Sequence, residues 1–352
     1  MRNLANLLVF GVSAALLAEA SADEIRFVDG RKPQQNVEVL DETLDKIEYR
    51  LAGVRQTQSY PSDKVLEVVY TRASDEYDVA MENLEFGAFS DAADLFKVAA
   101  QDARRQKGLA AKCLFLAGDA YRRGGMFDQA IKTFDDLESQ HPDSRYVPEA
   151  RLARGLSYLQ SGNEGKARQE FGKLRSDAGK LGARWGYEGE LRVQMLDESK
   201  DPGTALATYR RLAKETEMSH PTVANQAKLR IGRVLIAQGK SDEAEAFFRR
   251  ILDQRSASAR EVVAGAFNGL GTSLRNKAGA TAAEMKEALY AHLRVVVSFE
   301  EVAHELPEAL YGAGKCFQVV PAEDAVNRSR QMFYRVINEY PNSEWAAKAK
   351  QG

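Results

Sequence analysis

One spacing of small, aromatic and proline residues recurs in this 352-residue chain and constrains its fold more than any other feature. The fullest copy reads Gly-x2-Tyr-x8-Ala-x3-Phe-x7-Pro and consists of Gly118, Tyr121, Ala130, Phe134 and Pro142. Small residues let two antiparallel helices approach closely, and the aromatic rings fill the gap between them. The proline ends the second helix because it has no N–H and clashes with the preceding turn. The spacing therefore predicts a helical hairpin.

Copies of the pattern return downstream, so the hairpin is one unit of an array. The clearest copy is Gly155, Tyr158, Ala167 and Phe171, and a weaker one is Gly232, Leu235, Ala244 and Phe248. With the partial copies included, the sequence predicts a mainly α chain with about seven hairpins over residues 74–350. Because each hairpin buries its apolar face only against its neighbours, these residues should form one solenoid. Such an array favours a role as a binding scaffold over a role as an enzyme.

Residues 1–22 have the pattern of a bacterial secretory signal peptide. A basic start at Arg2 precedes an apolar run from Leu7 to Leu17, and Ala20-Ser21-Ala22 supplies small residues for cleavage after Ala22. The apolar run is too short to cross ~30 Å of hydrocarbon. We therefore predict an exported chain, periplasmic or secreted, with no transmembrane segment after cleavage.

Residues 23–72 differ in pattern from the rest of the chain. Short runs rich in β-branched and aromatic residues alternate with turn residues such as Asp29-Gly30-Arg31 and Pro61-Ser62-Asp63. Such runs predict about five strands. We expect them to close into a small β-barrel, because an open sheet of this size would leave exposed edges. The layout resembles SH3-like or Sm-like barrels.

The helical spacings resemble those of the tetratricopeptide repeat. The resemblance implies a right-handed α-α superhelix whose first helices line the concave face. It is close in the two hairpins that contain Gly118–Pro142 and Gly155–Phe171. It is partial elsewhere, since Leu235 and Phe317 replace a tyrosine and His292 replaces an aromatic residue.

Two junctions between hairpins narrow the resemblance. His141-Pro142-Asp143-Ser144 and Tyr340-Pro341-Asn342-Ser343 are similar to those of tetratricopeptide proteins of the bacterial cell envelope. Examples are the Tol–Pal-associated coordinator and the outer-membrane assembly lipoprotein. This chain has a β-rich segment where the coordinator has a coiled coil. No cysteine follows the apolar run to carry the lipid of the assembly lipoprotein.

Composition and motifs argue against several kinds of chemistry. Lys and Arg number 49 against 51 Asp and Glu, which gives a formal net charge of -2 and disfavours nucleic acid as a partner. The four histidines lack metal-ligand spacing, and no Gly-rich phosphate loop or nucleophile motif is present. We therefore expect no catalytic residues, metal or cofactor. Cys113 and Cys316 lie inside helical patterns near opposite ends of the array, so we expect buried free thiols.

A second face of each first helix points away from the residues that pack the hairpin, and we expect it to line a binding groove. Its mixed apolar and basic character suits an extended or helical peptide, with aromatic anchors and arginines on carboxylates. The alternative is that these side chains only cover a solvated surface. The predicted groove residues are Tyr77, Met81, Lys112, Phe115, Asp119, Arg122, Leu152, Leu229, Arg233, Arg275, Tyr311 and Lys315.

The sequence favours an exported, non-catalytic scaffold that binds other envelope proteins or peptides through its solenoid. A second interpretation is a cell-wall adaptor that contacts peptidoglycan through residues 23–72, by analogy with SH3-like barrels. An enzyme is a third interpretation. It would need a polar cluster in a closed pocket, which open solenoids rarely provide.

Overall fold

The computed structural model describes residues 23–71, 73–255, 258–321 and 323–351. The signal peptide predicted for residues 1–22 lies outside these ranges. The described chain divides into two compact units. The first comprises residues up to Gly124 together with Lys132–Ala150, and the second comprises Gly125–Ile131 together with the residues from Arg151 onward.

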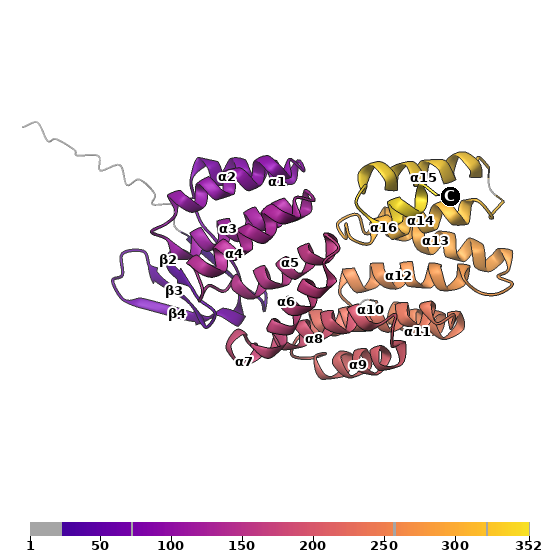
Figure 1. Cartoon of the computed structure of the whole chain (residues 1–352), viewed down its shortest axis with the longest axis horizontal. Coiled ribbons are helices and arrows are strands. Elements are labelled where there is room, and N and C mark those ends of the chain that lie inside the picture. The colour runs from indigo at the N-terminus through magenta and orange to yellow at the C-terminus, as the bar shows by residue number, and fades with distance from the viewer. Residues whose placement is uncertain (1–22, 72, 256–257, 322, 352) are drawn as a thin grey trace, which may run out of the picture. The chain divides into compact units, whose positions relative to one another are not determined.

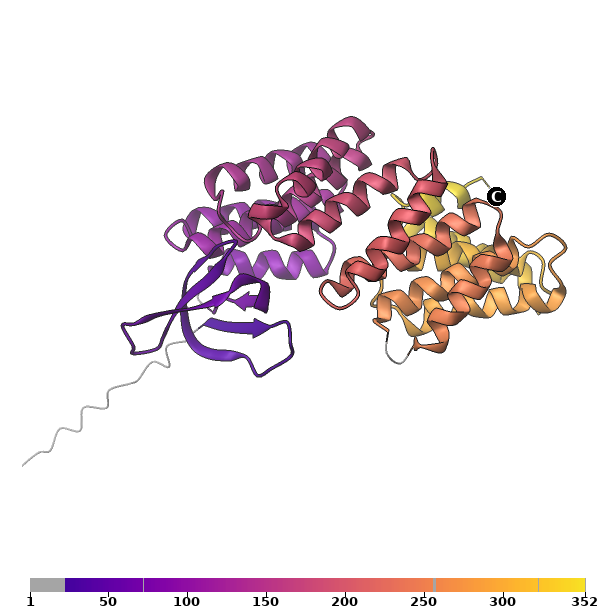
Figure 2. The ribbon, with the colours of Figure 1, turned by 90° about the horizontal axis from the view of Figure 1, so that it is seen from below.

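The first unit begins with a five-stranded antiparallel sheet, and the predicted number of strands is confirmed for the described residues. The strands follow the order β4-β3-β2-β1-β5 in the sheet. Figure 2 shows them beside the first helices of the chain. The strands are β1 (Asp23–Phe27), β2 (Gln34–Glu42), β3 (Lys46–Leu51), β4 (Thr57–Pro61) and β5 (Val65–Val69).

Alternating apolar residues give the sheet one buried face. In β1, Ile25 and Phe27 are buried while Arg26 between them is exposed. Val37 and Val39 repeat the alternation in β2. Because successive side chains of a strand point to opposite faces, this pattern fixes which face of the sheet meets the core.

The expected closed barrel is wrong, because the sheet is open. β4 and β5 are its two edge strands and are joined by the short 3-10 helix η1 (Ser62–Lys64). The prediction assumed that the two edge strands would pair with each other to satisfy their backbone hydrogen bonds. Instead, the side chains of Lys112 and Arg145 donate hydrogen bonds to the carbonyls of Val68 and Val65 at 2.8 and 2.7 Å. A residue of α3 and a residue of the turn between α4 and α5 thus occupy acceptors of edge strand β5, which reduces the need for closure.

A buried carboxylate fastens the sheet to the helices of the first unit. Glu42, at the end of β2, is fully buried and accepts hydrogen bonds from the hydroxyls of Tyr70 at 2.6 Å and Tyr146 at 3.2 Å. The Arg145 guanidinium lies 3.6 Å from the same carboxylate. Burial raises the pKa of Glu42, and the hydrogen bond from Tyr70 opposes that rise. The cluster joins residues far apart in sequence, so it holds the sheet in place.

Backbone bonds reinforce the same junction. The amide of Leu44 donates to the carbonyl of Asp143 at 2.8 Å, and Thr43 forms an isolated bridge with Ser144. The His141–Ser144 junction therefore pairs with the loop that follows β2.

Seven helical hairpins follow the sheet in the described residues, as predicted (Figure 1). A short helix, α7 (Ala178–Leu181), was not predicted, and α16 (Glu344–Ala349) follows the last hairpin. The hairpins are α1 (Asp75–Glu85) with α2 (Phe89–Asp102), α3 (Lys107–Arg123) with α4 (Phe127–Gln140), α5 (Val147–Gln160) with α6 (Glu164–Ser176), α8 (Ala183–Asp197) with α9 (Pro202–Glu215), α10 (Pro221–Ala237) with α11 (Ser241–Asp253), α12 (Arg260–Arg275) with α13 (Ala282–Ser298), and α14 (Leu306–Phe317) with α15 (Ala325–Glu339).

Glycines of the first helices face aromatic rings of the second helices. A Cβ atom placed on Gly118 would collide with the ring of Phe134, and one on Gly155 would collide with the ring of Phe171. Both rings are buried. In the second unit the first helices also pack in a row, with α8 and α12 both against α10, and α14 against α12.

Both cysteines are free and buried. Burial raises the pKa of the Cys113 thiol to about 12 and that of the Cys316 thiol to about 11. Neither thiol is therefore a nucleophile near neutral pH. Within the described ranges, every helix is too short or too polar to cross a membrane.

We predict opposite effects of alanine at two glycines of the third hairpin. Gly155→Ala should lower the free energy of unfolding by about 1–3 kcal/mol, because its methyl group overpacks against Phe171. Gly172→Ala on α6 should raise it by roughly 0.5–1 kcal/mol, since its methyl group meets open space and stiffens the unfolded chain. Urea unfolding followed by circular dichroism compares the two variants. Equal effects of both substitutions would contradict the role given to the ring contact.

A second prediction concerns the attachment of the sheet. Glu42→Ala should lower the free energy of unfolding by about 3–5 kcal/mol, because it leaves two buried tyrosine hydroxyls without their acceptor and the Arg145 guanidinium without its ion-pair partner. Thermal unfolding and the rate of proteolysis within residues 23–71 report the loss. The matched control is Glu48→Ala on β3, which removes only a surface pair with Lys46 and should change stability by less than about 1 kcal/mol. If the sheet of Glu42→Ala resists protease as the wild type does, the cluster does not hold it.

Candidate functional site

The predicted groove residues of α1 are only half-buried. Tyr77 and Met81 both keep part of their surface exposed. The Tyr77 ring meets Phe96 edge-on, with 5.7 Å between ring centroids. Burial raises the pKa of the Tyr77 hydroxyl, so it stays protonated and can act as a hydrogen-bond donor at neutral pH.

Three predicted residues of α3 share a partly exposed face. Phe115 stacks on Tyr146 with 5.8 Å between ring centroids and lies 6.2 Å from the ring of Phe134. Asp119 and Arg122 form an ion pair of 2.7 Å one turn apart. Aromatic surface and a paired charge are therefore available on this helix.

Lys112, the fourth predicted residue of α3, is directed to the sheet. Its side chain is 10% exposed, and Nζ donates to the carbonyl of Val68 at 2.8 Å. The carboxylate of Glu67 lies 3.6 Å away. Its charge stabilises the junction between α3 and β5.

In the second unit the structure brings two of the six predicted residues into one hollow. Leu229 and Arg233, both on α10, line a hollow of about 570 Å³. Leu152 lies on α5, Arg275 on α12, and Tyr311 and Lys315 on α14, and none of these four lines that hollow.

The Tyr311 ring forms a small aromatic group of its own. It lies 5.3 Å from the Trp345 ring and 5.9 Å from the Phe333 ring. The Arg275 guanidinium lies 5.9 Å from the centre of the Tyr311 ring. Arg275 and Tyr311 thus form a cation–π pair, which leaves Tyr311 only partly exposed.

The hollow lies on the row of first helices formed by α8, α10 and α12. Met195 of α8, Leu229 of α10 and Val262 of α12 give it apolar walls. Arginines from α8 and α10 and acidic residues from α12 and the start of α14 surround them. These charged residues are Arg192, Arg230, Arg233, Glu261 and Glu305.

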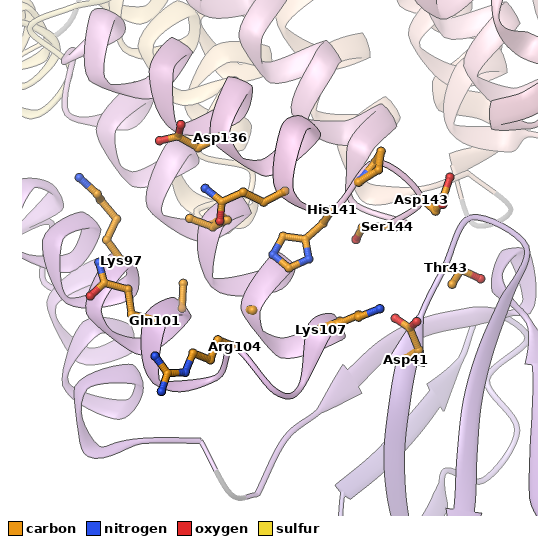
Figure 3. A pocket seen from close by; sticks show the side chains of 15 residues that line it. Asp41, Thr43, Lys97, Gln101, Arg104, Lys107, Asp136, His141, Asp143 and Ser144 are labelled. Carbon is orange, nitrogen blue, oxygen red and sulfur yellow. The ribbon is translucent and has the colours of Figure 1, made fainter.

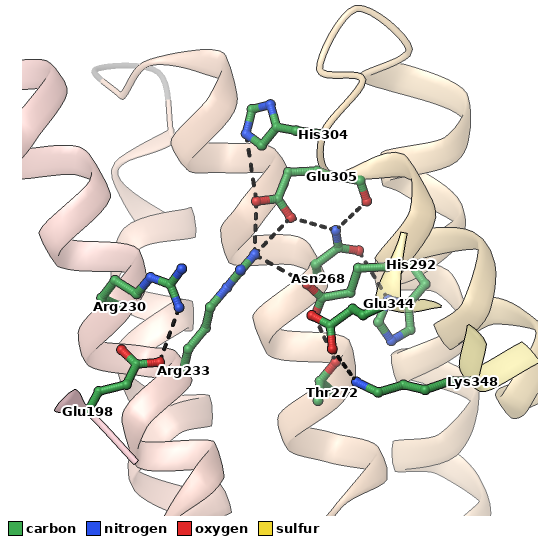
Figure 4. Close-up of polar contacts among 11 residues, drawn as sticks. Glu198, Arg230, Arg233, Asn268, Thr272, His292, His304, Glu305, Glu344 and Lys348 are labelled. Carbon is green, nitrogen blue, oxygen red and sulfur yellow. Dashed lines mark hydrogen bonds and ion pairs between the residues drawn. The ribbon is translucent and has the colours of Figure 1, made fainter. Parts of the chain in front are cut away.

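Arg233 is at the centre of a polar network (Figure 4). Its Nη2 atom lies 3.0 Å from Oε1 of Glu305 and 3.2 Å from Oε2 of Glu308. The amide of Asn268 donates to Oε2 of Glu305 at 2.8 Å, and the hydroxyl of Thr272 lies 3.4 Å from Oε1 of Glu308. The network connects α10, α12 and α14, so Arg233 ties three first helices together.

Two carboxylates share one guanidinium in this network, and both are buried. Burial raises the pKa of the Glu308 carboxyl; the Arg233 charge opposes this rise, and the neighbouring Glu305 carboxylate adds to it. The Nε2 atom of His304 also lies 3.9 Å from Oε1 of Glu305, so two basic side chains are within ion-pair distance of this pair of carboxylates.

The other two arginines of the hollow are also paired within the unit. Arg192 lies 2.7 Å from Glu188 and donates to the amide oxygen of Gln226 at 2.9 Å. Arg230 lies 3.2 Å from Glu198. A partner carboxylate would therefore have to compete with these internal acids.

The acidic partners were missed by sequence reasoning, although one of them had a signal. Glu308 lies six residues before Gly314 in α14, as Lys112 lies six residues before Gly118 in α3. The same register would have selected Glu308. Glu305 precedes the first residue of α14 and had no such signal.

A second hollow, of about 760 Å³, lies within the first unit (Figure 3). The end of α2, the start of α3, the end of α4 and the end of β2 surround it. His141 points into it, and burial lowers the pKa of this imidazole, which is then neutral at pH 7. Its charged lining is balanced, with the cations Lys97, Arg104 and Lys107 and the acids Asp41, Asp136 and Asp143.

None of the histidine, cysteine and acidic side chains in the described ranges form a cluster of three or more that could hold a metal ion. Both hollows are lined by polar and apolar side chains.

Comparisons with known proteins agree with the helical architecture. Family models described as tetratricopeptide repeat match residues 112–144 and 196–259. No curated protein sequence matches the chain.

Among solved structures, a tetratricopeptide repeat protein from Parabacteroides merdae is 16% identical, with a TM-score of 0.47 over 79% of this chain and 98% of that chain. The Cut9–Hcn1 hetero-tetramer of the APC/C is 13% identical, with a TM-score of 0.44 over 78% of this chain and 51% of that chain. The helical part of the chain is a tetratricopeptide-like solenoid, and an open antiparallel sheet precedes it.

Proposed function

We propose that this chain is an exported, non-catalytic scaffold that binds other envelope proteins or peptides through the first helices of its solenoid. A tetratricopeptide-like solenoid is consistent with a protein-interaction scaffold. The observation that carries the proposal is the hollow on α8, α10 and α12, where apolar walls and arginines converge.

The chemistry of the hollow indicates how a partner would bind. Met195 and Leu229, which are partly exposed above the buried Val262, offer apolar surface to an aliphatic or aromatic anchor. The guanidinium of Arg230 is held by one carboxylate, that of Glu198. A partner carboxylate that displaces Glu198 would form with Arg230 the contact that Glu198 loses. This replacement of one carboxylate by another gives specificity, and affinity comes mainly from the burial of apolar surface.

Export is supported by the sequence of residues 1–22, with its basic start, apolar run and small residues before Asp23. An envelope partner follows from this compartment and from the resemblance of the repeat junctions to those of envelope proteins.

We keep contact with the cell wall through residues 23–72 as a secondary proposal. The Glu42 cluster and the bonds from Lys112 and Arg145 give the sheet a structural task in the first unit. That task accounts for the presence of the sheet without a ligand.

Cross-linking from the hollow tests the scaffold proposal. A photoreactive phenylalanine analogue placed at Ala259, an exposed residue of the hollow, should form discrete adducts with envelope proteins in living cells. Mass spectrometry of the adducts identifies the partner. Thr222→Arg at the same hollow should reduce those adducts, because a bulky cation then occupies the binding surface.

The matched position for this experiment is Ala207, an exposed residue of α9 that lies outside the hollow. It should give none of the adducts seen from Ala259. Identical adducts from both positions, or none from Ala259, would rule out the hollow as the partner site.

Export has a separate test. Residues 1–22 fused to alkaline phosphatase should give active enzyme in a bacterium, because that enzyme needs disulfides that form only outside the cytoplasm. A second fusion carrying Leu8→Arg and Val9→Arg should be inactive, since charge interrupts the apolar run. An inactive wild-type fusion would refute the export part of the proposal.

A further inference from the structure

A cationic hollow of about 400 Å³ lies among α9, α10 and α11 of the second unit. Both α9 and α11 pack against α10, and Figure 1 labels the three helices. Only Asn225 and Val262 line both this hollow and the one on the first helices. It is therefore a separate surface.

The lining of this hollow carries excess positive charge. Four cations and a single carboxylate contribute to it, namely Arg210, Lys214, Lys228, Arg250 and Glu217. Glu217 is held by Lys228 at 2.8 Å. Among the described residues, no carboxylate lies within ion-pair distance of Arg210, Lys214 or Arg250. Arg210 and Lys214 are thus available to a ligand, unlike the paired arginines of the first helices. Arg250 donates to the carbonyl of Ala246 at 3.3 Å, and its guanidinium lies 5.9 Å from the centre of the Phe247 ring.

Beneath the cations the floor is apolar. Ile231 is buried, and Phe247 and Ile251 are partly buried side chains that pack against the core. All three line the hollow. An apolar floor with a cationic rim suits a ligand that carries both an apolar group and negative charge.

Stabilisation of helix ends explains only part of this charge. Lys214 and Arg250 are in the last turns of α9 and α11, where cations interact favourably with the helix dipole. Arg210 lies one turn earlier in α9, and Lys228 lies in the middle of α10. The dipole does not account for these two.

We propose that this hollow docks an acidic segment of a partner protein, which inserts one aromatic or aliphatic side chain against Ile231, Phe247 and Ile251. The charge of the rim is complementary to such a segment, and the floor supplies the apolar contact. A free phosphate would leave the floor unused. A flat anionic membrane would not reach into a concave surface.

The test uses the full purified chain and a fluorescent synthetic peptide of alternating Asp and Ser with one central Phe. Fluorescence anisotropy should show binding that weakens as salt is added. Arg210→Glu with Lys214→Glu should weaken binding by about tenfold or more, because attraction becomes repulsion. A peptide with Ser in place of Phe should also bind more weakly.

The matched control is Lys240→Glu with Lys286→Glu, which makes the same change in net charge at exposed residues outside the hollow. It should bind the peptide as the wild type does. Arg210→Gln with Lys214→Gln guards against misfolding, because it should weaken binding while the unfolding midpoint is unchanged.

Three results would overturn the proposal. The two glutamate double variants could weaken binding equally, which would indicate general charge attraction. The Ser peptide could bind as tightly as the Phe peptide. Vesicles of phosphatidylglycerol could bind through Arg210 and Lys214 while the peptide does not, which would identify a membrane site. Because the assay probes α9–α11 directly, its outcome is independent of cross-linking from Ala259.

Discussion

In five hairpins of the described residues, a glycine of the first helix lies in steric contact with a ring of the second helix. The ring of Phe248 lies against Gly232 of its own hairpin and against Gly269 of the next one, where a Cβ atom on either glycine would collide with it. Helices this close cannot accommodate a side chain at the crossing point, and the ring fills the space that the two glycines leave. The Phe248 ring thus joins the two helices of its own hairpin and also joins that hairpin to the next one, so the stacking of these two hairpins depends on it.

His292 shows that this constraint concerns shape more than chemistry. It occupies the ring position of its hairpin, and Cβ atoms on Gly271 or Gly312 would collide with it. Burial lowers the pKa of His292 to about 3, so the ring is neutral and packs as an aromatic side chain would. Its Nδ1 lies 3.2 Å from the amide oxygen of Asn268, and the same amide donates to Glu305. The polar ring of His292, which lies against the two glycines, thereby connects the packing of the hairpin to the Arg233 network.

Because the contact between glycine and ring is formed by residues close in sequence, the hairpins could be predicted well from the sequence. Spacing within about forty residues determines which residues meet, and the predicted pattern falls on the observed hairpin, with Gly118 and Tyr121 on α3 and Ala130 and Phe134 on α4. The open sheet was harder to predict, because side chains distant in sequence bond to its edge strand β5. Lys112 reaches Val68, and Arg145 reaches Val65, 80 residues away. Local sequence patterns do not indicate such long-range pairs. The strand pattern alone therefore favoured a closed barrel, and the helix pattern alone assigned Lys112 to the groove.

The same limit applies to charge on the binding surfaces. Sequence spacing assigned Arg233 to the exposed face of α10, but its partner Glu305 is 72 residues away and could not be inferred from that spacing. An arginine that already holds buried carboxylates gains little from a new acid, because breaking the old pair offsets the new one. Free cations behave differently: Arg210 and Lys214 lose only hydration when an acidic partner arrives. On the first helices, apolar contact should therefore dominate affinity, whereas on α9–α11 long-range attraction should speed association and make it sensitive to salt. The two proposed surfaces would therefore bind different partners, or two parts of the same partner.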